Sequence, residues 1–181
     1  MKRTLALIAF LALVLAALSP AIALADSATH TYQFHMEHPN ISEASNGDRV
    51  AVTGMGTFSV HPDSVRGGGT FTHTNAGGSV IGKGTWTATE LIEYQSYGCG
   101  AVMGNPLPPN FCGGALKMRI VATPGGTNLQ IEAILTIFCI VGPNPPNSHD
   151  DPSGEGIHLV VPGIINFNKI VEGMNIYIQQ S

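Results

Sequence analysis

The chain has 181 residues, a formal net charge of −4 and only 11% charged residues. No basic stripe is present, which argues against a nucleic-acid-binding protein. With 22 glycines and 12 prolines, the composition favours a β protein with shaped loops over a helical one.

The first 25 residues have the pattern of a secretory signal peptide. Met1-Lys2-Arg3 is basic, residues 5–18 are apolar, and Ala23-Leu24-Ala25 is a small-x-small cleavage site. We therefore expect a cleaved leader (1–25) and a single β domain (26–181) in a secreted, periplasmic or other extracytoplasmic location. Later apolar stretches are strand-sized, so we expect no transmembrane anchor.

Hydrophobic alternation with period two marks eight predicted strands along the rest of the chain. Connections between them are mostly short, which favours sequential antiparallel strands. We expect an all-β, single antiparallel domain, first as an up-and-down eight-stranded barrel and second as a β-sandwich. The predicted strands are 30–36, 48–60, 65–74, 79–94, 115–123, 128–141, 156–168 and 174–179.

A repeated Gly-x-Gly-Thr-aromatic motif predicts the strand register. The motif begins at Gly54, Gly67 and Gly82. With turns at 61–64 and 75–78, Phe58 would face Gly67, and Gly56, Gly69 and Gly84 would form one row. An aromatic ring covering a glycine compensates for the missing side chain, and a row of glycines lets a sheet bend into a small barrel.

The glycine-paired strands between Val50 and Tyr94 resemble those of small barrel families such as the allene oxide cyclases, dirigent proteins and calycins. The resemblance implies a barrel. It carries no site residue and no activity over to this chain.

Three cysteines follow the leader, in a compartment where disulfides are permitted. We expect Cys99–Cys112, with Cys139 as a buried free thiol. Pairings of Cys139 with Cys99 or Cys112 remain open at this stage.

Two long, proline-rich loops, 95–114 and 142–155, are expected at the same end of an up-and-down barrel. Long loops in compact domains are frequently functional. They would form a binding mouth, above an interior lined by aromatic residues. We expect ligand contacts from Phe58, Phe71, Trp86 and Tyr94.

The alternation also places Glu90 on the inward face near this mouth, with Tyr94 and the turn residue His61 close by. A buried carboxyl beside such groups could act as an acid/base catalyst of the isomerase or cyclase type. His73 is expected to face inward at the opposite end. No pattern indicates a cofactor or a metal, because the acidic loop around His149 and Glu155 matches no calcium-loop spacing.

The leading hypothesis is an exported, non-enzymatic β-barrel, a monomer or homodimer, that binds an unknown small apolar molecule or surface partner. The alternatives are a small barrel enzyme that uses Glu90 with Tyr94 or His61, and a structural or interaction module that assembles through strand 128–141.

Overall fold

The computed structural model of the chain describes residues 29–143 and 154–180, so the expected leader lies outside the described residues. Within these ranges the chain is all-β, with no helix. The strands are β1 (His30–Met36), β2 (Asn40–Ala44), β3 (Arg49–Val60), β4 (Ser64–Thr74), β5 (Val80–Cys99), β6 (Ala101–Val102), β7 (Asn105–Pro106), β8 (Phe111–Pro124), β9 (Ile131–Cys139), β10 (Gly156–Val161), β11 (Ile165–Glu172) and β12 (Asn175–Gln179).

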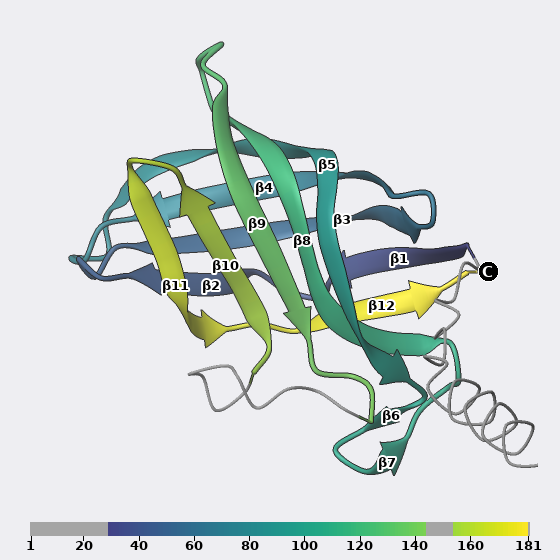
Figure 1. Cartoon of the computed structure of the whole chain (residues 1–181). Helices are drawn as coiled ribbons and strands as arrows, with labels where there is room; N and C mark the ends of the chain where they lie inside the picture. The colour runs from purple at the N-terminus through teal and green to yellow at the C-terminus, as the bar shows by residue number, and fades with distance from the viewer. Residues whose placement is uncertain (1–28, 144–153, 181) are drawn as a thin grey trace, which may run out of the picture.

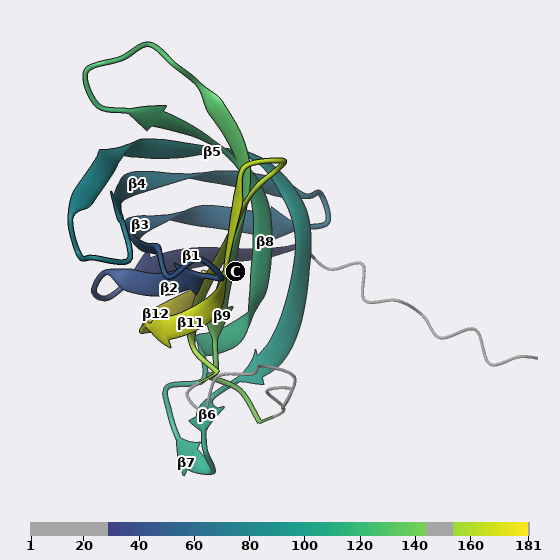
Figure 2. The ribbon, with the colours of Figure 1, turned by 90° about the vertical axis from the view of Figure 1, so that its left-hand side faces the viewer.

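Eight strands form a closed ring in chain order (Figure 1). β2, β3, β4, β5, β8, β9, β10 and β11 each pair antiparallel with the next, and β11 pairs back onto β2. Figure 2 views the ring from one side of the molecule, turned by 90°. The expected all-β antiparallel fold is confirmed. A ring of eight strands in chain order agrees with an up-and-down barrel and, in flattened form, with the sandwich alternative.

The first and last strands close a shorter circuit at one end of the ring. β1 pairs with the second half of β3 and with β12, and β12 pairs with the start of β8. The circuit β1–β3–β4–β5–β8–β12 therefore contains six strands. Since the interior of a closed sheet widens with strand number, this six-strand end is narrower than the opposite, eight-strand end.

Each end is defined by its connections. The six-strand end carries the turn at 61–63 and the β6–β7 hairpin. The eight-strand end carries the turns at 45–48, 75–79, 125–130 and 162–164, toward the upper left of Figure 1.

The predicted strand count agrees with the ring, but the members differ. β2 and the β6–β7 hairpin were not predicted, and the expected strand 156–168 is two strands, β10 and β11. Pro162-Gly163 makes the turn between them, where Gly163 has φ +72° and Ile164 N–H donates to Val161 O at 3.0 Å. A positive φ suits glycine because it has no Cβ.

The predicted glycine register is wrong by two residues in each hairpin. Gly56 pairs with Gly67, and Gly54 pairs with Gly69, which in turn faces Trp86. The first turn lies one residue earlier than expected, and the second hairpin contains a bulge between His73 and Thr74. A shift of two keeps every side chain on its predicted face, because the side-chain period is two.

Aromatic rings do cover the glycines, from different neighbours than expected. A Cβ on Gly54 would collide with the Trp86 ring, and one on Gly56 would lie 2.6 Å from the Phe34 ring. The Trp86 indole N–H donates to Thr53 O at 2.9 Å, which fixes its ring over the glycines. The glycines thus allow two large rings to pack directly on the sheet backbone.

Candidate functional site

The interior of the six-strand end, below the expected mouth, is filled by an aromatic cluster. Phe58 is 1% exposed, and its ring centroid lies 4.9 Å from Tyr32, 4.7 Å from Tyr94 and 5.7 Å from Tyr177. Two of the four residues expected to contact a ligand, Phe58 and Tyr94, therefore pack into this cluster. The loop 142–155 is described only at its two ends, and His149 lies outside the described residues.

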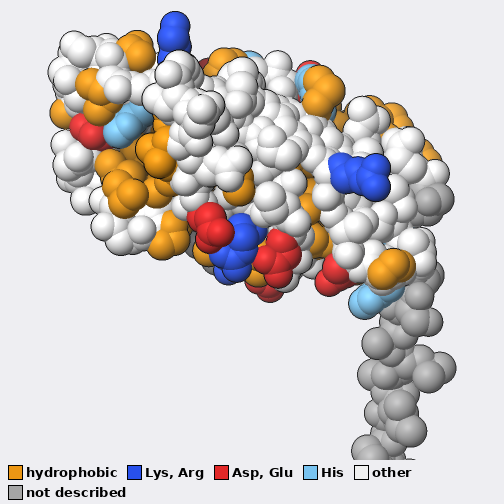
Figure 3. Space-filling model, turned by 90° about the horizontal axis from the view of Figure 1, so that it is seen from above, with side chains coloured by type: hydrophobic (Ala, Val, Ile, Leu, Met, Phe, Trp, Pro, Cys, Tyr) orange, Lys and Arg blue, Asp and Glu red, His pale blue; other side chains and the backbone are white. Residues whose placement is uncertain are grey.

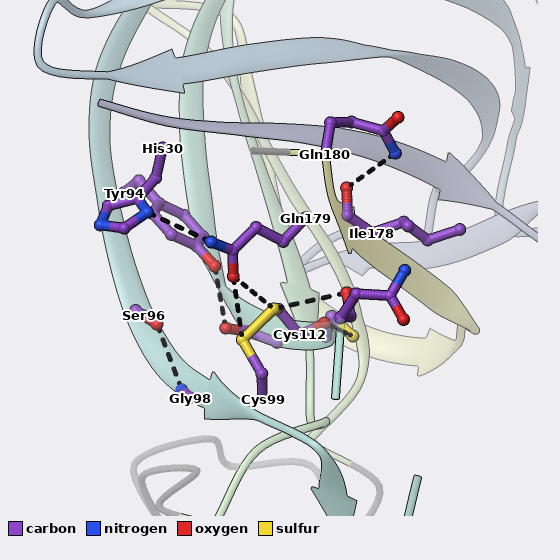
Figure 4. Close-up of a disulfide and its surroundings, with 12 residues drawn as sticks. His30, Tyr94, Ser96, Gly98, Cys99, Cys112, Ile178, Gln179 and Gln180 are labelled. Carbon is purple, nitrogen blue, oxygen red and sulfur yellow. Dashed lines mark hydrogen bonds between the residues drawn. A yellow bond between two sulfur atoms is a disulfide. The ribbon is translucent and has the colours of Figure 1, made fainter. Parts of the chain in front are cut away.

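The expected disulfide is confirmed at this end. Cys99 and Cys112 are bonded and are also cross-strand partners of β5 and β8 (Figure 4). Cys139 is a buried free thiol. Gln179 lies against the disulfide, with its Oε1 3.8 Å from Cys112 Sγ. Burial raises the pKa of the Cys139 thiol to about 12, so this thiol is poorly suited to nucleophilic chemistry.

Tyr94 is held inside the fold by its hydroxyl group. Its O–H donates to Gly113 O at 3.0 Å, and burial raises the pKa of the phenol. The ring also covers Gly114, since a Cβ there would lie 2.5 Å from it. Tyr94 thus has a clear packing role.

Glu90 does not face inward as expected. A bulge in β5 between Ala88 and Glu90 reverses the alternation, so that Ala88 and Leu91 point inward and Glu90 points out. The Glu90 side chain is 57% exposed and accepts a hydrogen bond from Arg119 Nε at 2.9 Å. A β-bulge re-aims side chains in this way.

The structure does not bring the three candidate catalytic residues together. Glu90 lies on the outer face, Tyr94 lies in the interior, and His61 is exposed in the turn between β3 and β4. Thr29 Oγ1 donates to the His61 carbonyl oxygen at 2.6 Å. Glu90, Tyr94 and His61 therefore do not form the buried acid/base group that the catalytic alternative requires.

A cavity of about 280 Å³ opens at the eight-strand end, away from the two long loops. Its lining is apolar and includes Phe71 and Trp86, the other two residues expected to contact a ligand. Space remains because Gly82, Ala122 and Ala133 carry little or no side chain where the ring has eight strands. The volume is close to the lower bound of about 300 Å³ for small-molecule sites.

Exposed hydrophobic residues surround this opening. Ile81 and Ile164 line the cavity, yet are 56% and 73% exposed, and Val80 lies beside Ile81 at 59%. Figure 3 shows hydrophobic side chains gathered at the left-hand end of the molecule, which is the eight-strand end in Figure 1. Apolar side chains left in water around a concave apolar site are typical of a binding surface.

His73 also lines the cavity, and it faces inward as predicted. Its Nε2 lies 3.1 Å from Asp48 Oδ2, and its ring meets Phe167 edge-on at a centroid distance of 5.2 Å. Asp48 is positioned by the Ala76 N–H, which donates to Oδ1 at 3.2 Å. The sequence signal for this pair was weak, because the two residues are joined only through the β3–β4 register.

A second cluster of polar groups surrounds Asn175 at the six-strand end. Its Nδ2 donates to Asn40 Oδ1 and to Phe138 O, both at 2.9 Å, and its backbone N–H donates to Glu155 Oε1 at 2.5 Å. Burial raises the pKa of Glu155 to about 7, against the lowering effects of the Asn175 N–H and of His38. These hydrogen bonds fix the position of the chain where β12 begins.

Over residues 29–143 and 154–180, no three His, Cys, Asp or Glu side chains cluster as metal ligands would. In the same ranges, no helix has the length and hydropathy to cross a bilayer. The arrangement is chemically suited to holding a small apolar molecule at the eight-strand end.

Comparison with protein-family models, with curated proteins and with solved structures finds no match to this chain.

Proposed function

We propose that this chain is an exported protein that binds a small, mostly apolar molecule in the cavity at the eight-strand end. The observation that carries the proposal is the 280 Å³ apolar cavity, which contains Trp86 and opens between exposed isoleucines. A concave apolar volume with few polar groups is the common form of a small-ligand site.

Export is supported by two independent features. The leader pattern at 1–25 directs a chain out of the cytosol, and the Cys99–Cys112 disulfide is stable in an oxidising compartment. A carrier or receptor for a sparingly soluble molecule would operate in such a compartment.

Trp86 provides a direct test, because it is the single tryptophan of the chain and lines the cavity. Titrating the oxidised protein with heptyl methyl ether should give a saturable change in tryptophan fluorescence. We expect a Kd on the order of 0.1 mM, which corresponds to about 0.6 kcal/mol for each of nine heavy atoms.

Two variants of β8 form a matched pair for this experiment. Ala122→Phe adds a ring to the cavity wall and should weaken binding at least about tenfold, since little volume remains. Thr123→Phe adds the same ring one residue further on, where the strand alternation points it outward, and should leave the Kd within about twofold. Calorimetry gives the Kd of both variants without relying on Trp86. Absence of saturable binding to the parent protein, or equal binding to both variants, would contradict the proposal.

A further inference from the structure

Among the side chains that line the cavity at the eight-strand end, His73 can offer a ligand a hydrogen bond. Of the lining residues, Trp86 and His73 carry polar atoms, and the Trp86 N–H is already donated to Thr53 O. The remaining lining side chains are aliphatic or aromatic, apart from Gly82. A ligand of this cavity therefore finds its side-chain polar contact at His73.

The Asp48 carboxylate determines which nitrogen of His73 carries the proton. A carboxylate only accepts hydrogen bonds, so Nε2, at 3.1 Å from Asp48 Oδ2, must be the protonated nitrogen. In an uncharged imidazole the other nitrogen, Nδ1, is then a hydrogen-bond acceptor. It lies across Cε1 from Nε2 and so is directed away from the carboxylate.

The ring of His73 is held in this orientation from two sides. Asp48 is 15% exposed and is itself bound by the Ala76 N–H, while Phe167 contacts the imidazole ring edge-on. Within the described residues, Nδ1 has no hydrogen-bond partner. His73 lines an otherwise apolar wall, and a fixed, unpaired acceptor on such a residue favours ligands that carry a donor.

We propose that His73 accepts a hydrogen bond from a hydroxyl group of the ligand, so that the cavity selects an alcohol or a phenol with an apolar body. The inference rests on the proposed function, because it names the ligand class of the same cavity. An anionic ligand is disfavoured by the geometry, since its carboxylate would lie beside Asp48 and would require a second proton on the ring. An ether of equal size is disfavoured because it has no donor.

Three probes of similar size test the selection at pH 8, where an imidazole is ordinarily uncharged: 1-octanol, heptyl methyl ether and octanoate. We expect 1-octanol to bind about three- to tenfold more tightly than the ether, the range of one net hydrogen bond. Octanoate should bind more weakly than 1-octanol. Trp86 fluorescence and calorimetry both report these affinities.

His73→Phe keeps a ring in the wall but removes the acceptor. In this variant the preference for 1-octanol over the ether should disappear, while the Kd of the ether stays within about threefold of the parent value. The double variant His73→Phe/Asp48→Asn serves if the single variant does not fold, because it leaves no unpaired carboxylate. Ile81→Ala is the control, since it changes the rim of the cavity and should weaken both probes equally.

The outcomes distinguish failure of the inference alone from failure of the proposed function. If none of the probes binds, both fail. If the alcohol and the ether bind the parent protein equally, or if the preference survives in His73→Phe, the cavity binds apolar molecules but His73 does not select a donor. Tighter binding of octanoate than of 1-octanol would also overturn the inference, because it would identify a protonated His73 that recognises an anion.

Discussion

Among the described carboxyl groups, burial has its clearest effect on Glu155. Its pKa is about 7, because burial raises it more than the Asn175 N–H and His38 lower it. The folded protein therefore binds this proton more tightly than the unfolded chain does. The free energy of unfolding should fall as the pH rises from about 4.5 to 7, and the full cost, of roughly 3 kcal/mol at most, should persist above pH 7.

Glu155→Gln should remove this pH dependence. The amide keeps an oxygen for the Asn175 N–H and carries no charge. Urea unfolding should show the variant to be about 1–3 kcal/mol more stable than the parent at pH 8, and equally stable at pH 4. Glu93→Gln is the control, because Glu93 is exposed on β5 and should leave the pH profile unchanged. A Glu155→Gln variant whose stability differs from that of the parent by the same amount at both pH values would contradict the raised pKa, because the carboxyl would then titrate alike in the folded and the unfolded chain.

At the scale of strands, alternation predicted which face each residue of β1, β3 and β4 occupies. Alternation does not predict the pairing register of the strands or the positions of the bulges. Pairing shifted by two in both hairpins because rings on β1 and β5 pack over glycines of β3 and β4, a preference that turn length alone does not reveal. The bulge after Ala88 turns Glu90 outward, and no residue type at this position indicates a bulge.

The packing of rings on glycines predicts a contrast between two substitutions to alanine. Gly54→Ala would push a methyl group into the Trp86 ring and to 2.8 Å from Gly68 O, so it should destabilise the protein by about 1–3 kcal/mol. Gly82→Ala meets nothing closer than His73 Cβ at 3.8 Å, and should change stability by less than about 1 kcal/mol. Urea unfolding followed by Trp86 fluorescence measures both, and equal losses would refute the assigned register.

At the scale of the whole molecule, the two ends of the ring differ in what fills them. From the sequence we expected the binding mouth at the end with the long loops, because loop length and proline content can be read directly from a sequence. The pairing of β1 with β12, the first and last of the described strands, cannot be read from the sequence in the same way. That pairing closes the six-strand circuit and encloses the aromatic cluster, and the remaining space lies at the opposite end.

Removal of the disulfide tests whether the two ends act separately. Cys99→Ala/Cys112→Ala opens a link with a sequence separation of 13 and should lower the free energy of unfolding by about 3 kcal/mol. The cavity lies at the other end, so the folded variant should bind heptyl methyl ether with a Kd within about twofold of the parent value. Loss of binding in a variant that is still folded would show that the ends are coupled.

The central claim is that a small apolar ligand lies inside the eight-strand end. Intermolecular NOEs between unlabelled 1-octanol and the isotope-labelled protein locate the ligand most directly. The account predicts NOEs to the methyl groups of Ala122, Ala133 and Ile120, which line the cavity. NOEs confined to Tyr94 or to residues 100–110, at the six-strand end, would contradict it.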